Sequence, residues 1–253
     1  EDREKEVAVA PALPALPSQA EQDAHNLTHL PWRSWCRYCV RGGARDDSHQ
    51  QSQEKTTPGG LPECQTDYFY MGKKKDEESR TGITLVHCGS GAVCATALPT
   101  KATGGYVVDF FVNCLNEWGF RDVIIRSDQE PALRAVLAGV KDKRAGEILL
   151  EHSPKFSHQS VGHAEQANGA LENQTRTILD RVHHMCGIEV DTKSAVMAWA
   201  IRHSGWLITR YRILSNGKTS YEMVKLKRYN GAICEFGEVV HGRDARPTTL
   251  TNK

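Results

Sequence analysis

Three β-rich runs follow one another with no helical pattern between them, and this order constrains the fold of the chain more than any other feature. They are TDYFYM at 66–71, GITLVHCG at 82–89 and AVCATALPT at 92–100. Each is rich in β-branched and aromatic residues, which is typical of strands. A Ser-Gly pair between the second and third runs predicts a tight turn.

The following region alternates between helical and strand-like patterns. Residues 105–118 and 131–140 predict helices, and 122–128 and 147–153 predict short strands. Longer helical patterns cover 163–186 and 193–212. The apolar stripe of the first of these long helices consists of Ala164, Ala167, Leu171, Ile178, Val182 and Met185. Three strands followed by alternating helices and strands predict an α/β domain with a mixed sheet.

Shifts in composition divide the chain into five segments. Residues 1–24 are rich in Ala and Pro and predict a disordered linker, and 46–62 predict a second, polar linker. Between them, 25–45 form a compact segment rich in His, Cys, Trp and Arg. Residues 63–215 contain the α/β domain, and 216–253 form a segment that follows it.

Charge and cysteine content narrow the choice of partners and setting. The net charge is only +1, but cations gather in 201–229 and could meet phosphates. No run approaches the ~18 apolar residues of a membrane span, so no membrane partner is expected. With no secretory signal and one close Cys pair among eight cysteines, we expect a reduced, intracellular setting.

Two aspartates lie in or directly after apolar strands. Asp67 falls inside TDYFYM, and Asp128 ends VIIRSD. Strands hold side chains in rigid positions, and a carboxylate there is costly unless something neutralises it. A pair of Mg²⁺ ions bridged by carboxylates, ~3.5–4 Å apart, would do so and could activate one oxygen while stabilising another.

A third acid opens the long helix. Glu165 follows the polar loop residues Gln159, Ser160 and Gly162, and on a helical wheel it lies well away from the apolar stripe. Taken singly, each of the three acids has an ordinary explanation, as a satisfied strand residue or a solvated helical one. As an ordered set they indicate a site for divalent metal ions.

The three motifs TDYF, IRSDQEPAL and SPKFSHQSVGHAEQAN occur in the order found in retroviral and retrotransposon integrases, and the chain resembles the catalytic core of copia-like members. The resemblance covers roughly 64–230. It implies a ribonuclease H-like fold, with a mixed five-stranded sheet flanked by helices. It also implies that Asp67, Asp128 and Glu165 hold two Mg²⁺ or Mn²⁺ ions.

The same resemblance implies a reaction and partners. The reaction is 3′-end processing of element DNA followed by strand transfer into target DNA, two in-line displacements at phosphorus. Origin in a retrotransposon polyprotein, action as a homo-oligomer and a nuclear location on chromosomal DNA follow by analogy. The expected DNA contacts near the metals are Lys155, His158, Gln159, Asn168 and Arg176.

A second candidate metal site precedes the core. His25, His29, Cys36 and Cys39 are four good Zn²⁺ ligands within a short segment. They resemble the His-His-Cys-Cys module of integrases, although only six residues, including Pro31, separate the His pair from the Cys pair. Two readings stay open: a zinc site, or an unmetallated remnant in which one or both histidines are not ligands.

Two other functions remain possible for the whole chain. One is a nuclease of the same fold that carries out no strand transfer. The other is a decayed or domesticated retroelement product that binds nucleic acid through 25–45 and 201–229 without catalysis. The text of 216–243 also resembles the segment after the core in copia-like elements, with Ser220 replacing a Pro, and predicts that a C-terminal DNA-binding barrel is absent or incomplete.

Overall fold

A five-stranded sheet with the strand order β3-β2-β1-β4-β5 forms the centre of the computed structural model, which describes residues 17–43, 60–72, 79–101, 104–152 and 161–241. The strands are β1 (Glu63–Met71), β2 (Arg80–His87), β3 (Val93–Leu98), β4 (Val123–Ser127) and β5 (Ile148–His152). β1, β2 and β3 pair antiparallel, whereas β4 pairs parallel with both β1 and β5. The predicted mixed five-stranded sheet is confirmed, with β1 in the middle.

Local sequence explains how the strands are connected. Antiparallel neighbours can be joined by a short turn, and Gly91 takes the left-handed conformation (φ +65°) in the turn between β2 and β3. The parallel half needs crossovers, which helices α3 (Gly105–Trp118) and α4 (Pro131–Lys143) provide. α3 ends at the left-handed Gly119, and α4 begins with Pro131, which needs no hydrogen-bond partner there.

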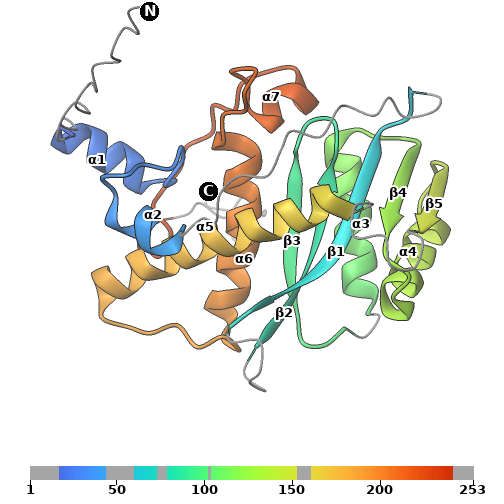
Figure 1. Ribbon diagram of the computed structural model, residues 1–253, viewed down its shortest axis with the longest axis horizontal. Coiled ribbons are helices and arrows are strands. Elements are labelled where there is room, and N and C mark those ends of the chain that lie inside the picture. Colours follow the sequence, from blue (N-terminus) through green and yellow to red (C-terminus); the bar gives the residue numbers. More distant parts are fainter. Residues whose placement is uncertain (1–16, 44–59, 73–78, 102–103, 153–160, 242–253) are drawn as a thin grey trace, which may run out of the picture.

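Two pairs of helices cover the two faces of the sheet (Figure 1). α3 and α4 pack on one face in a core that includes Cys64 and Tyr68 of β1. The long helix α5 (Gly162–Cys186) and α6 (Ala195–Tyr211) pack on the other face, against Phe69 and Met71. Alternation along β1 therefore sends its even-numbered side chains toward α3 and α4 and its odd-numbered ones, including Asp67, toward α5.

The N-terminal helices lie against the far end of α5 (Figure 1). α1 (Gln19–Asn26) begins inside the segment predicted as a linker, because Ser18 and Glu21 form a capping box that starts the helix. α2 (Arg37–Gly42) approaches α5 closely through Gly42, where an added Cβ would lie 2.2 Å from Thr177 Oγ1. Residues 19–24 of the first predicted linker are therefore helical, whereas residues 1–16 and most of the second predicted linker lie outside the described residues.

The segment after the core packs back on α6. Thr219 and Glu222 form a capping box at the start of α7 (Ser220–Lys225). Arg210 of α6 pairs with Glu117 and lies 4.7–5.3 Å from the ring centres of Trp206, Tyr221 and Tyr229. Part of the basic stretch predicted to meet phosphates is thus engaged within the protein.

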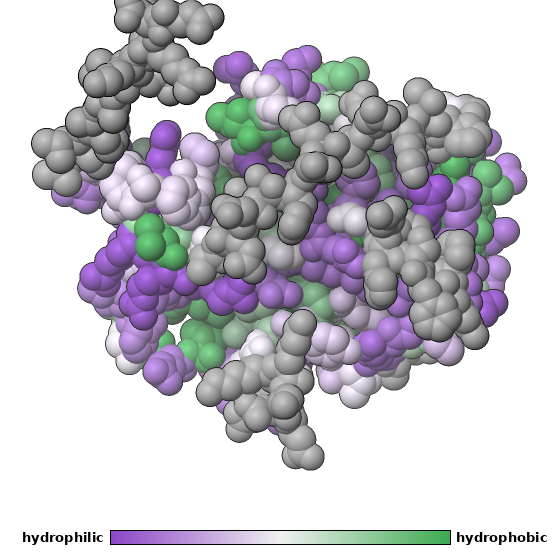
Figure 2. Space-filling model, viewed as in Figure 1, coloured by the Kyte–Doolittle hydropathy of each residue, from purple (hydrophilic) through white to green (hydrophobic). Residues whose placement is uncertain are grey.

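The surface of the face that carries α5 is largely hydrophilic along that helix, with separate hydrophobic patches elsewhere (Figure 2). Five residues of the predicted apolar stripe are buried, but Met185 is 44% exposed because the last turn of α5 extends past the sheet. No helix within the described ranges is long and apolar enough to cross a membrane.

Leu171 tests the packing of α5 on the sheet. Its side chain is fully buried, so Leu171→Ala should lower the free energy of unfolding by about 2–5 kcal/mol through lost contacts and a residual cavity. Leu149 of β5 is 42% exposed, and Leu149→Ala is the matched control, with an expected change below about 1 kcal/mol. Urea denaturation measures both, and equal losses would contradict the assigned packing.

Candidate functional site

Strand β1 holds Asp67 on the face covered by α5. The carboxylate is partly buried, and its Oδ1 accepts a hydrogen bond from the Tyr68 backbone N–H at 2.8 Å. The aspartate is directly opposite Thr84 in the antiparallel pairing with β2. It is therefore held in the middle of the sheet rather than at an edge.

The parallel pairing of β1 with β4 brings Asp128 beside Asp67. The pairs Glu63↔Ile124, Cys64↔Ile125 and Gln65↔Arg126 share one register. Continued by two residues, this register places Asp128, just after the end of β4, next to Asp67. Oδ1 of Asp128 accepts a hydrogen bond from the Glu130 backbone N–H at 3.1 Å, which fixes the turn into α4.

The first turn of α5 is attached to the same strand by Gln65. Helix N-termini leave backbone N–H groups without partners, and Val161 at the N-cap supplies no side-chain acceptor. Oε1 of the buried Gln65 instead accepts from the backbone N–H groups of His163 and Ala164, at 3.0 and 3.3 Å. Sequence reasoning missed Gln65, whose only signal was an amide within an otherwise β-rich run.

Asn168, one turn further along α5, makes a second attachment. Its Nδ2 donates to Asp67 Oδ2 at 3.1 Å and to the Tyr68 carbonyl at 3.3 Å. Asn168 was predicted as a DNA contact, but it is 7% exposed and its amide hydrogens are engaged with β1. Four helical residues advance about 6 Å and two strand residues about 6.7 Å, so α5 and β1 match in spacing between the two attachments.

Both attachments place Glu165 near the aspartates. It lies in the first turn of α5, between the residues that Gln65 and Asn168 engage, and its side chain is exposed, as predicted. Glu172, further along the same face, pairs with Arg176. The helix therefore presents Glu165 at its end nearest the aspartates.

The electrostatics of Asp67 reflect this crowding. Burial raises the pKa of its carboxyl to about 6, the Tyr68 N–H lowers it, and the carboxylates of Asp128 and Glu165 raise it further. Lys101 lowers it, but its ammonium pairs with Glu130 at 2.7 Å. The site thus concentrates negative charge that its neighbours only partly compensate.

The three carboxylates do not converge as closely as the ligands of the N-terminal cluster. Within the part of the chain that the structure describes, His25, His29, Cys36 and Cys39 are the one group of three or more such ligands drawn closely together. Carboxylates repel one another, and Glu165 is exposed and free to change its side-chain torsions.

Three predicted DNA contacts, Lys155, His158 and Gln159, lie outside the described residues. Arg176 is exposed and bonds to Asn173 at 2.5 Å.

The His/Cys cluster has the dimensions of a tetrahedral metal site. All four side chains are buried, and one potential ligand atom of each lies within 4.8 Å of the others. Nε2 of His25 is 3.3 Å from Cys39 Sγ, and Nδ1 of His29 is 3.5 Å from Cys36 Sγ. Zn–S bonds of about 2.3 Å and Zn–N bonds of about 2.0–2.1 Å require ligand separations of this size. Both histidines therefore lie with the two cysteines, in positions that could hold a metal ion.

Local conformation explains how so short a segment converges. His25 lies in the last turn of α1, and His29 takes the left-handed conformation (φ +53°), which is uncommon outside glycine and reverses the chain. Cys36 occupies the N-cap position of α2, and Cys39 lies in the first turn of that helix. Hydrogen bonding between the two sulfurs lowers the pKa of Cys36 and raises that of Cys39, so one thiolate, the metal-binding form, is favoured.

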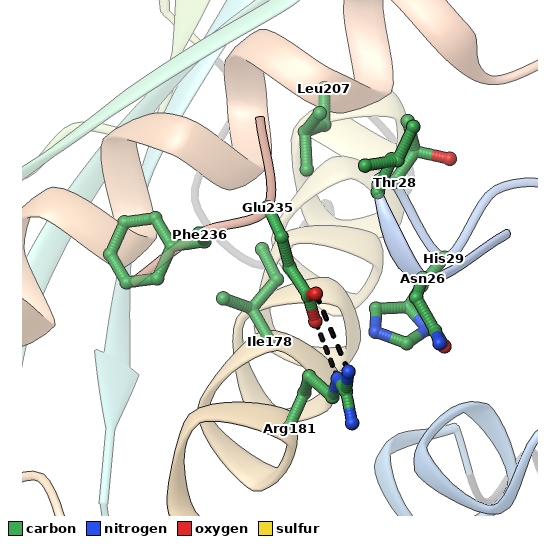
Figure 3. Close-up of a pocket in the computed structure, with 9 residues that line it drawn as sticks. Asn26, Thr28, His29, Ile178, Arg181, Leu207, Glu235 and Phe236 are labelled. Atoms are coloured by element: carbon green, nitrogen blue, oxygen red, sulfur yellow. Dashed lines mark hydrogen bonds and ion pairs between the residues drawn. The ribbon is translucent and has the colours of Figure 1, made fainter. Parts of the chain in front are cut away.

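The cluster is joined to the C-terminal half of α5. Gln174 Nε2 donates to the Thr28 carbonyl at 2.6 Å, beside His29. Arg181 donates to the Tyr38 hydroxyl at 3.2 Å and forms an ion pair with Glu235. Figure 3 shows this ion pair between Arg181 of α5 and Glu235 of the segment after α7, with His29 on a neighbouring loop. One helix therefore contacts both candidate metal sites.

The raised pKa of Asp67 predicts a pH effect on stability. A carboxyl with a higher pKa in the folded state than in the unfolded state stabilises the fold at low pH, and this contribution is lost as pH rises from about 4 to about 6. Without divalent ions, the free energy of unfolding of the wild-type chain should fall between pH 4 and pH 7 by on the order of 1–2 kcal/mol more than that of Asp67→Asn. Parallel curves for the two proteins in chemical denaturation would contradict the shift.

Comparisons with known proteins support the fold. No protein-family model and no curated protein sequence matches the chain. Among solved structures, a chain of the simian T-cell lymphotropic virus intasome in complex with the PP2A regulatory subunit B56 gamma aligns with a TM-score of 0.51 at 19% identity, covering 82% of this chain and 69% of that one.

Two structures of the HTLV-2 integrase catalytic core domain in complex with magnesium, in trimeric and dimeric form, also align. They are 18% and 20% identical, with TM-scores of 0.44 and 0.41, and the alignments cover 65% and 64% of this chain and 97% of each core domain. At these TM-scores the two core domains add no argument of their own. The predicted α/β fold, a mixed five-stranded sheet flanked by helices, is confirmed, and the chain of the intasome shares it.

Proposed function

We propose that this chain is a retroelement integrase of the copia-like kind, which catalyses metal-dependent 3′-end processing and strand transfer of element DNA into target DNA. One observation carries the proposal. The register of β1 and β4 aligns Asp67 with Asp128, and the first turn of α5, with Glu165, is attached to the same strand by Gln65. The likeness of the fold to a chain of a retroviral intasome supports it.

The donor set fits divalent ions such as Mg²⁺ or Mn²⁺. These are hard cations that prefer carboxylate oxygens. The raised pKa of Asp67 supports this choice. Burial and the carboxylates of Asp128 and Glu165 disfavour the charged form of Asp67, so a bound cation would lower an existing electrostatic cost. Asp67 and Asp128 would hold both ions, and Glu165 would complete the second.

The chain's own residues would organise the reaction around these ions. When bound, two divalent ions activate the attacking oxygen and stabilise the leaving oxygen of an in-line displacement at phosphorus. Asp67 and Asp128 are held by β1 and by the turn into α4, so their carboxylates need little reorganisation. Glu165, being exposed, would close on the site when DNA and ions bind.

The proposal extends to partners and setting. DNA ends and target DNA would lie across the end of α5 that carries Glu165, with contacts from Lys155, His158 and Gln159 before the helix and from Arg176 on its exposed face. Assembly into a homo-oligomer and action in the nucleus belong to the same proposal. The segments 25–45 and 216–253 would flank the core of 63–215.

Zinc is the metal that we propose for the His/Cys cluster. Two imidazoles and two thiols at tetrahedral separations suit Zn²⁺, and complete burial of four protein ligands is typical of a structural rather than a catalytic site. Its function would be to hold α1 and α2 together, because few other side chains form their common core.

Asp128→Asn tests the catalytic proposal. The substitution removes a charge that would hold both ions, so Mn²⁺-dependent cleavage and joining of labelled duplex DNA should fall by roughly 10²-fold or more, while DNA affinity stays within a few-fold. Asp109→Asn, at a half-exposed aspartate on α3, is the matched control and should keep activity. A wild-type chain that binds DNA but never cuts it would favour the binding-only alternative, and one that cuts but never joins would favour a nuclease.

Cys39→Ser tests the zinc proposal. The wild-type chain should bind one Zn²⁺, measured by elemental analysis after dialysis, and chelation should lower its melting temperature. Cys39→Ser should lose the metal and melt at a lower temperature than the zinc-bound wild type, because structural zinc contributes directly to folding. Cys186→Ser, at an exposed cysteine of α5, should behave as wild type. Stoichiometric zinc in the Cys39→Ser protein would contradict the assignment.

A further inference from the structure

A chain of hydrogen bonds runs from strand β2 to the carboxylate of Asp67. Thr84 Oγ1 donates to Asn168 Oδ1 at 2.6 Å, and Asn168 Nδ2 donates in turn to Asp67 Oδ2 at 3.1 Å. Thr84 is fully buried and Asn168 is 7% exposed, so water does not compete at either residue. The chain thus links three elements, β2, α5 and β1, at one carboxylate.

The amide of Asn168 can be oriented in only one way within these contacts. Its two N–H groups face the Asp67 carboxylate and the Tyr68 carbonyl, both of which are acceptors. Its oxygen faces the Thr84 hydroxyl, which can donate. Rotation of the amide by half a turn would bring its oxygen against the carboxylate of Asp67. The Thr84 hydroxyl therefore favours the orientation in which Asn168 donates to Asp67.

Thr84 is itself held rigidly. It is paired with Asp67 across β1 and β2, so its side chain emerges on the same face of the sheet. Its β-branched side chain has few accessible torsions in a strand, which fixes the direction of the hydroxyl. Each oxygen of Asp67 then accepts one hydrogen bond, Oδ1 from Tyr68 and Oδ2 from Asn168, and about one lone pair on each remains for a cation.

We propose that Thr84 is a positioning residue of the metal site. Acting through Asn168, it sets the orientation of the Asp67 carboxylate before ions or DNA bind, and it touches neither. This inference rests on the proposed function, since it assumes that Asp67 binds a divalent ion. It gives a residue at the centre of the sheet a part in ion affinity, in addition to the part of the three acidic residues.

The test is a Mn²⁺ titration of the full chain, with one equivalent of Zn²⁺ bound, followed by the electron paramagnetic resonance signal of free Mn²⁺. Thr84→Val replaces the hydroxyl with a methyl group of similar size and should raise the Kd for Mn²⁺ roughly three- to tenfold. Thr84→Ser keeps the hydroxyl and should restore most of the affinity. In DNA cleavage, Thr84→Val should lower kcat at low Mn²⁺ without raising KM for DNA.

Thr175→Val is the matched control. Thr175 is also fully buried, and its hydroxyl donates to Ser204 Oγ at 2.9 Å, on α5 but away from Asp67. This variant should lose comparable stability and keep the wild-type Kd for Mn²⁺. Equal loss of Mn²⁺ affinity in Thr175→Val and Thr84→Val would overturn the inference, because it would show a general effect of destabilisation.

The remaining outcomes separate the inference from the proposed function. If Asp67→Asn abolishes Mn²⁺ binding while Thr84→Val binds as wild type, Thr84 is not a positioning residue and the proposed function stands. If Asp67→Asn binds Mn²⁺ as tightly as wild type, the metal site itself is wrong. Thr84→Ala is a second variant without the hydroxyl, and failure of both such variants to fold while Thr84→Ser folds would overturn the inference in favour of a purely structural role.

Discussion

The position of helix α5 relative to strand β1 is the constraint on which the proposed metal site depends. Gln65 accepts hydrogen bonds from the first turn of the helix, and Asn168 donates to Asp67 one turn later. The two contacts are compatible because two strand residues and four helical residues advance by similar distances. They fix both the position of the helix and the place where Glu165 emerges, beside an aspartate whose charge is only partly compensated.

The same helix connects this site to the N-terminal cluster. Its first half is attached to β1, and its second half contacts α2 and the loop of His29 through Gln174 and Arg181. Burial of Leu171 and its neighbours holds the middle of α5 on the sheet. A structural metal in the cluster would therefore stabilise a segment that is packed on the core, rather than an independently moving module.

Polar groups buried beneath α5 fix the orientation of the Asp67 carboxylate. A buried amide or hydroxyl is tolerated when each donor and acceptor is paired, and Asn168 meets this condition through Thr84, Asp67 and the Tyr68 carbonyl. Such a network favours one orientation of the carboxylate over others, which hydrophobic packing alone cannot do. Lys101 lies nearby but is paired with Glu130, so it only partly offsets the negative charge.

The sequence alone determined the order and type of the elements of the α/β core, because strand and helix periodicities are local and strong, and it singled out Asp67, Asp128, Glu165 and the four His/Cys residues as candidates. It predicted a disordered linker over residues 1–24, although a capping box starts α1 at Gln19. Only the tertiary structure decided that both histidines join the cysteines despite the short spacing, that Asn168 is buried against Asp67, and that Gln65 and Thr84 support the site. Those roles depend on contacts between segments far apart in the chain, which no local pattern records.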